Sequence, residues 1–135
     1  MMVNQNLKIK DQNQAQSLKR EVRYRAFYLA IDIIKFLESL EYKRSIKIIS
    51  DQMIRCTTSI GANIVEAKSS SSKKEFLNYF QIALKSANEA KYWLAMLQEL
   101  LPKKKQEIEI FLKETDEISK IIGTSVLTMK GKRSL

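Results

Sequence analysis

The sequence contains no histidine, and this absence excludes several classes of active site at once. Without histidine there is no serine–histidine–aspartate triad and no zinc site with an imidazole ligand. The single cysteine, Cys56, leaves no intramolecular disulfide and no cysteine-rich metal centre, and it suits a reducing compartment. The three glycines, Gly61, Gly123 and Gly131, form no phosphate-binding loop. We therefore expect no enzymatic activity, no cofactor and no metal.

The chain also lacks the uninterrupted apolar run of roughly 18 residues that a membrane-spanning helix needs. Its first 16 residues are rich in Asn, Gln and Lys, and they lack the apolar core of a signal peptide. This composition predicts a flexible polar arm over residues 1–17. On these grounds we expect a cytoplasmic protein that makes no contact with a membrane.

One proline, three glycines and 44% hydrophobic residues favour an ordered, helical chain. Hydrophobic periodicity predicts an all-α helix bundle over residues 18–130, with a basic tail over 131–135. The four expected helices span about 18–40, 46–67, 73–101 and 105–129. Ser45 is the expected N-cap of the second helix, and Gly131 the expected end of the fourth.

The third predicted helix carries the clearest pattern, with apolar residues at alternating spacings of four and three. The resulting stripe consists of Phe76, Phe80, Ala83, Ala87, Ala90, Leu94, Leu97 and Leu101. The small alanines in its middle predict close approach of a neighbouring helix. Ser72 and Glu75 have the spacing of a capping box, which predicts the start of this helix. Gly61, inside the second helix, predicts a kink or a close backbone contact.

Two of the predicted helices carry more apolar surface than one bundle core can bury. Phe27, Ile31 and Ile34 lie nearly opposite the core-facing residues of the first helix, and Tyr79 and Trp93 flank the stripe of the third. A helix with two apolar faces needs two partners, and aromatic side chains are frequent at subunit interfaces. We therefore predict that these five residues belong to an oligomer interface.

Lysine and arginine outnumber aspartate and glutamate by 24 to 15, which gives a net charge of +9. Such an excess favours polyanionic partners, with nucleic acid ahead of an anionic membrane surface. The predicted contact residues are Arg20, Arg23, Lys73, Lys74, Lys103, Lys104, Lys105, Lys130, Lys132 and Arg133. Two alternatives stay open. A lysine-rich helical face is also simply well solvated, and arginines beside aromatic residues suit bundle packing as well as nucleic acid.

Three segments carry a distinctive pattern: RCTTSIGANIVEA over 55–67, SKKEF over 72–76 and IALKSANEAKYWL over 82–94. They closely resemble the bacterial four helix bundle protein family, and the resemblance extends over about residues 24–129. That family includes proteins encoded in intervening sequences of large-subunit ribosomal RNA genes. It also includes the accessory variability determinant of diversity-generating retroelements. The chain departs from the family at three positions. Family members more commonly have alanine where this chain has Cys56 and Val65, and many have glycine where it has Ala67. These differences affect packing but not the fold.

The resemblance implies an antiparallel up-and-down four-helix bundle that assembles as a ring-like homopentamer with a basic surface around its axis. The matching polar positions are Arg55, Ser59, Asn63, Glu66, Glu75 and Glu89. We interpret them as a polar network that sets the helix register, with assembly or nucleic-acid contact as the alternative. Glu89 lies among apolar residues and needs a partner, and Arg55 is the predicted one.

Charge and resemblance together predict a non-enzymatic, basic, oligomeric scaffold that binds RNA or DNA with little sequence specificity. In the retroelement members of the family, such a scaffold works with a reverse transcriptase, so an accessory role beside a nucleic-acid enzyme is implied. The alternative is an adaptor ring that docks a protein partner and has no role with nucleic acid. The family's older ribosomal label does not imply a ribosome component.

Overall fold

The computed structural model describes residues 21–134, with side chains over 21–131, and this part of the chain contains helices and no strand. The elements are α3 (Val22–Glu38), α4 (Arg44–Lys68), α5 (Lys73–Leu100), the 3-10 turn η1 (Pro102–Lys104) and α6 (Lys105–Ser134). The predicted all-α fold with four α-helices is confirmed for the described residues. The predicted polar arm and Arg20 lie outside them.

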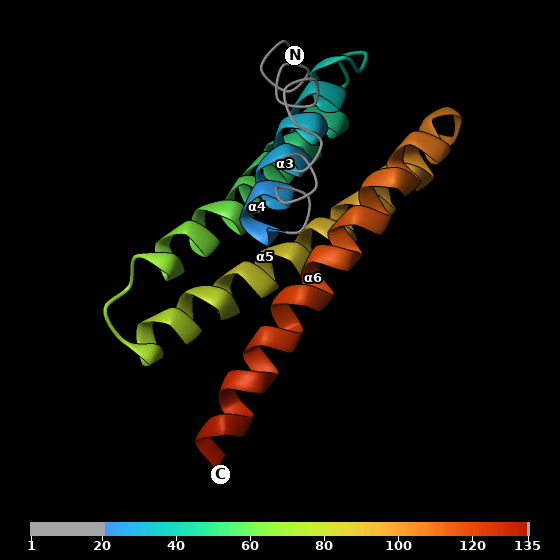
Figure 1. The fold of residues 1–135 in the computed structure, drawn as a ribbon. Helices are drawn as coiled ribbons and strands as arrows, with labels where there is room; N and C mark the ends of the chain where they lie inside the picture. The colour runs from blue at the N-terminus through green and yellow to red at the C-terminus, as the bar shows by residue number, and fades with distance from the viewer. Residues whose placement is uncertain (1–20, 135) are drawn as a thin grey trace, which may run out of the picture.

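Each helix packs against two neighbours, in the cyclic order α3, α4, α5, α6. Consecutive helices run in opposite directions (Figure 1), as the short connections over 39–43, 69–72 and 101–104 require. The bundle therefore has two distinct ends. We call the end with the 39–43 and 101–104 connections the loop end, and the end with the 69–72 connection and the C-terminus of α6 the turn end.

The helices differ in length, so the two ends of the bundle differ in structure. α3 has 17 residues, whereas α5 has 28 and α6 has 30. Figure 1 shows α3 lying along the half nearest the loop end, while the other three helices continue toward the turn end. At 1.5 Å per residue, α5 alone is about 42 Å long, which sets the separation of the two ends.

The core follows the predicted stripe of α5. Six of its eight residues are buried, and Phe76 and Leu101 pack partly buried at the two ends of the core. Two buried hydroxyl groups, those of Thr57 and Thr115, donate to the carbonyl oxygens of Met53 and Phe111, each at 2.7 Å. These bonds within single helices let polar side chains enter the core without an unsatisfied donor.

The helix boundaries confirm one predicted cap and correct two others. The Ser72 hydroxyl accepts the Glu75 backbone N–H at 3.1 Å, as the capping box predicts. α4 begins at Arg44, so Ser45 lies in its first turn and is not the N-cap. α6 continues through Gly131 to Ser134, and the predicted end at this glycine is wrong. A glycine ends a helix by adopting a positive φ, and no described glycine does so.

Gly61 makes the close contact that its position predicts. A Cβ atom built on it would lie 3.6 Å from the Ala26 Cβ and 3.7 Å from the Phe27 backbone nitrogen, which is ordinary van der Waals distance. We expect Gly61→Ala to raise the free energy of unfolding by up to about 1 kcal/mol, because alanine favours the helix. Gly61→Leu should lower it by about 1–3 kcal/mol, because its further carbons meet the α3 backbone. Chemical denaturation checks both values, and an alanine variant less stable than wild type would contradict this packing.

Candidate nucleic-acid interface

Several cations on the sides of the bundle are held by carboxylates, and Arg25, between α3 and α6, is one of them. Its Nε and Nη2 donate to the two Glu114 carboxylate oxygens at 2.9 and 2.6 Å, and Nη2 also donates to Glu117 at 2.7 Å. The hydrogen bond to Glu114, more than any other interaction, raises the pKa of Arg25 above its ordinary value. This arginine therefore holds two helices together and is not available to an external anion.

A second set of ion pairs joins α5 to α6. Lys91 Nζ lies 3.3 Å from Asp116 Oδ1 and 3.2 Å from Ser119 Oγ, and Lys120 Nζ lies 3.0 Å from the other Asp116 oxygen. Hydrogen bonds from Lys120 and then Lys91 hold the pKa of Asp116 below its ordinary value. Asp116 thus neutralises part of the positive charge that Lys91 and Lys120 place on this side of the bundle.

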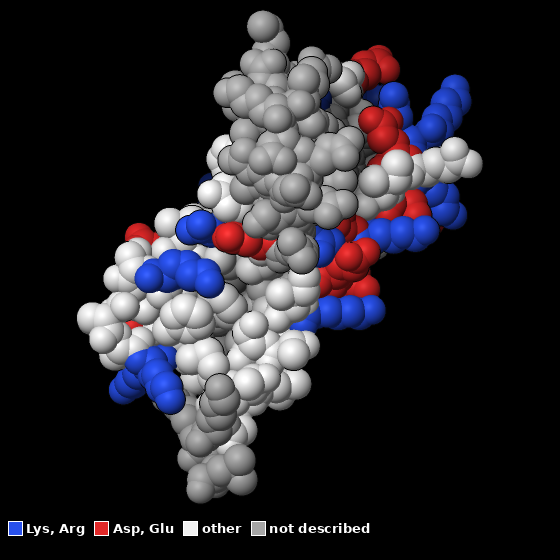
Figure 2. All heavy atoms as spheres, viewed as in Figure 1, with Lys and Arg blue, Asp and Glu red and all other residues white. Residues whose placement is uncertain are grey.

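The lysines at the two ends of the bundle are in a different situation. Five of the predicted contact residues are exposed and form no ion pair within the described part of the chain. They are Lys73, Lys74, Lys103, Lys104 and Lys105. In Figure 2, basic side chains lie over the α4–α5 turn with few acidic ones beside them, whereas both signs alternate along α6. All five of these lysines lie at the ends of the bundle.

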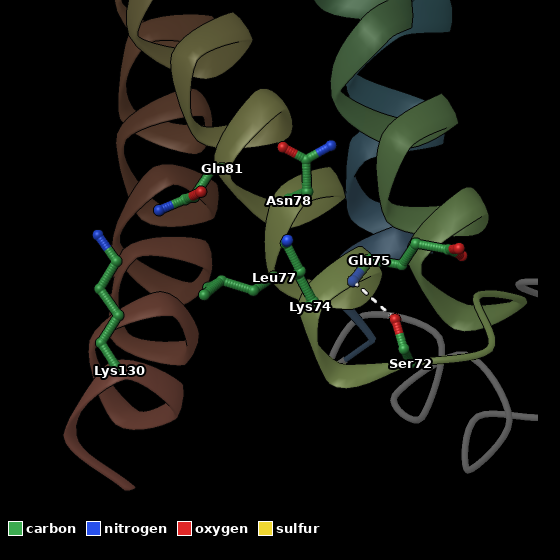
Figure 3. Close-up of a pocket in the computed structure, with 7 residues that line it drawn as sticks. All are labelled: Ser72, Lys74, Glu75, Leu77, Asn78, Gln81 and Lys130. Atoms are coloured by element: carbon green, nitrogen blue, oxygen red, sulfur yellow. Dashed lines mark hydrogen bonds between the residues drawn. The ribbon is translucent and has the colours of Figure 1, made fainter. Parts of the chain in front are cut away.

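At the turn end, α5 and α6 enclose a polar hollow of about 640 Å³. Its lining residues are Ser72, Lys74, Glu75, Leu77, Asn78, Gln81 and Lys130 (Figure 3). Lys130 comes from α6, whereas Lys74, Asn78 and Gln81 come from α5, so ammonium groups from two helices and two amides from α5 line one hollow. Ammonium and amide groups donate to phosphate oxygens, and no aromatic ring lines the hollow to stack on a base. This chemistry suits a sugar–phosphate backbone.

At the loop end, a smaller recess of about 380 Å³ lies between the 39–43 and 101–104 connections. Its charged lining residues are Glu41, Lys43, Lys103 and Lys104. Sequence analysis identified the last two but missed Lys43, because it treated residues 41–44 only as a connection. The basic pair Lys43 and Arg44, directly after an aromatic residue, was the available signal.

The remaining predicted contact residues do not join either group, apart from Lys130 in the turn-end hollow. Arg23 lies on α3, pairs with Glu21 at 2.9 Å, and its guanidinium carbon lies 4.9 Å from the centre of the Tyr24 ring. Lys132 and Arg133 lie in the last turn of α6, and their side chains are outside the described residues. The predicted set is therefore divided between two ends of the bundle about 40 Å apart.

A family model described as 23S rRNA-intervening sequence protein matches residues 18–124. The chain belongs to this family. Among solved structures, it is similar to a protein of unknown function from the S23 ribosomal protein family of Bacteroides thetaiotaomicron, with 32% sequence identity and a TM-score of 0.71. That match covers 78% of this chain and 98% of the other. No curated protein matches the chain.

The polar residues on which the chain resembles its family all lie in the described part of the chain, and they do not form one connected network there. Ser59 accepts hydrogen bonds from Ser86 at 2.8 Å and from the Asn63 amide at 3.0 Å, which joins α4 to α5. Sequence analysis missed Ser86 as a member. Glu75 belongs to the helix cap instead, and Arg55 and Glu66 are exposed.

The predicted ion pair between Arg55 and Glu89 does not form. Glu89 instead accepts a hydrogen bond from the Trp93 indole N–H at 3.1 Å, four residues along the same helix. Both charged side chains are exposed, so water solvates them and neither requires an ionic partner.

Three of the five predicted interface residues line one apolar groove of about 590 Å³ between α3 and α4. They are Phe27, Ile31 and Ile34, and Ala62 and Val65 face them from α4. Phe27 is 54% exposed and Val65 is 55% exposed, so this apolar face is open in the single chain. Tyr79 and Trp93 lie on α5, partly buried against the core, and do not line the groove.

Cys56 behaves as a core residue of the bundle. It is buried, and this burial raises the pKa of its thiol to about 12, so it stays neutral and unreactive at physiological pH. Within the described residues, no three cysteine, aspartate or glutamate side chains are grouped to hold a metal ion. None of the described helices combines the length and apolar character that a bilayer crossing needs.

Proposed function

We propose that this protein is a non-enzymatic, cytoplasmic scaffold that binds RNA or DNA through the phosphate backbone. The observation that carries the proposal is the contrast between the two kinds of basic residue. Arg25, Lys91 and Lys120 on the helix sides pair with carboxylates, whereas Lys73, Lys74 and Lys103 to Lys105 at the two bundle ends are exposed and form no ion pair among the described residues. Positive charge without an internal partner is the charge that a polyanion can neutralise.

The physical basis of this binding is counterion release. Each lysine that neutralises a phosphate frees condensed cations from the nucleic acid, which favours association without reading the sequence. Five such lysines per chain give moderate affinity, and several copies in one assembly add avidity because later contacts become intramolecular. A role as accessory to a nucleic-acid enzyme such as a reverse transcriptase fits a binder of this kind.

The test is fluorescence anisotropy of a labelled mixed-sequence RNA and a labelled DNA duplex, titrated with the protein over a series of salt concentrations. The proposal predicts binding whose affinity falls steeply as salt rises, with little difference between unrelated sequences. Affinity that does not depend on salt, or no binding near physiological salt, would contradict it.

We also propose that the scaffold is a ring-like homo-oligomer, a pentamer by its family resemblance, with the α3–α4 groove in the subunit interface. An exposed apolar groove of this extent is the kind of face that association buries. Wild-type protein is expected to have a light-scattering mass near five times the 15.7 kDa of one chain. Phe27→Glu should reduce that mass, because it places a charge in the groove.

A matched control separates interface disruption from general effects of the added charge. Ile110 on α6 is 68% exposed and lies outside the groove, so Ile110→Glu should leave the assembly intact. Equal masses for both variants would show that the groove is not a subunit interface.

The alternative function is an adaptor that docks a protein partner, and the open apolar groove is the observation that favours it. A pull-down performed with and without nuclease discriminates the two. Loss of the partner after nuclease supports the nucleic-acid scaffold, whereas retention supports the adaptor.

A further inference from the structure

Tyr42, at the loop end, is the most exposed of the large apolar and aromatic side chains in the described part of the chain, with 74% of its surface accessible. It lies in the short connection between α3 and α4. The other four tyrosines each contact a neighbouring aromatic ring, a guanidinium group or the core. Tyr42 makes no such contact with any described residue, so its ring is available to a ligand.

The surroundings of Tyr42 are basic. Its two chain neighbours, Glu41 and Lys43, both line the loop-end recess together with Lys103 and Lys104. The recess therefore carries three ammonium groups against one carboxylate, and Tyr42 lies in the chain between two of its lining residues. Arg44 follows at the first residue of α4 and is exposed as well.

An exposed aromatic ring beside several cations is the combination that binds unpaired nucleotides. The ring stacks on a base, while the lysines neutralise the adjoining phosphates. A duplex offers its phosphates to the same lysines, but its bases are already stacked on one another and are closed to the ring. Such a site therefore prefers single strands.

We propose that Tyr42 is a base-stacking residue and that the loop end, with Lys43, Lys103 and Lys104, binds single-stranded nucleic acid. This inference rests on the proposed function, and it specifies that the loop end of the bundle binds single strands in preference to duplexes. The turn-end hollow has lysines and amides but no aromatic ring in its lining, and it binds backbone phosphates without regard to strandedness. The two ends of one bundle thus differ in specificity.

The experiment compares Tyr42→Ala and Tyr42→Phe with wild type, using one labelled single strand and its duplex in anisotropy titrations over a salt series. Tyr42→Ala should weaken single-strand binding about tenfold, because the stacking on one base is removed. Its salt slope and its duplex affinity should stay at wild-type values, since no charge changes. Tyr42→Phe keeps the aromatic face and should bind as wild type does.

Tyr92→Ala is the matched control, because Tyr92 is 60% exposed on α5 and lies outside both basic recesses. It should change neither affinity. Tyr42→Ala protein that binds the single strand as tightly as wild type, or that loses single-strand and duplex binding equally, would overturn the inference while leaving the proposed function standing. Wild-type protein that binds neither nucleic acid would contradict the proposed function itself.

Discussion

Reversing five lysines together, at Lys73, Lys74, Lys103, Lys104 and Lys105, is expected to weaken RNA binding by at least about 100-fold near physiological salt. These side chains are exposed and form no ion pair in the described part of the chain, so their charge is available to phosphate. Glutamate at each position removes an attraction and adds a repulsion. Anisotropy titration of a mixed-sequence RNA measures the loss, which should be similar for unrelated sequences.

A control for this prediction compares two pairs of lysines, so that the same amount of charge is changed at two different places. Lys85 and Lys113 are exposed lysines on the sides of α5 and α6. The double variant Lys85→Glu with Lys113→Glu therefore matches Lys73→Glu with Lys74→Glu in net charge. We expect the turn-end pair to weaken binding much more than the side pair. Equal losses would mean that only bulk charge matters and that the bundle ends are not contact sites.

Truncation of the α5 stripe is expected to have the largest effect on stability. Leu94 lies on this stripe and is fully buried, with 0% of its surface exposed. Leu94→Ala should lower the free energy of unfolding by about 3 kcal/mol, because it removes buried methyl groups and leaves a cavity between packed helices. Chemical denaturation measures the change, at fixed protein concentration because the proposed oligomerisation would couple to folding.

Leu127→Ala makes the same chemical change on the surface of α6, where the side chain is 71% exposed. It should alter the unfolding free energy by no more than about 0.5 kcal/mol. Similar losses at Leu94 and Leu127 would show that the stripe is not the core of the bundle.

The fold was predictable wherever the spacing of apolar residues indicates which side chains are buried. The alternating spacing on α5 identified six buried residues because a helix returns to the same face every three or four positions. The cap at Ser72 followed from local chemistry, as did the close contact at Gly61. The continuation of α6 through Gly131 could not be predicted, since glycine ends a helix only when it adopts a positive φ.

The candidate site was predictable in composition but less so in arrangement. Arg25 pairs with Glu114, which lies 89 positions further along the chain. Only tertiary structure brings those residues together. Conversely, Arg55 and Glu89 were expected to pair and do not, because both remain in water. Tyr42 and Lys43 were overlooked because a short connection carries no periodicity to mark it.

The salt dependence of RNA binding, compared between wild-type protein and the five-lysine variant, tests most directly whether the bundle-end lysines contact phosphate. The logarithm of the wild-type binding constant should fall linearly and steeply with the logarithm of salt concentration. The variant should show a slope shallower by roughly 0.7–0.9 for each phosphate that the protein no longer neutralises. The same slope in both proteins, or a flat slope in the wild type, would contradict the proposal that these lysines bind a nucleic-acid backbone.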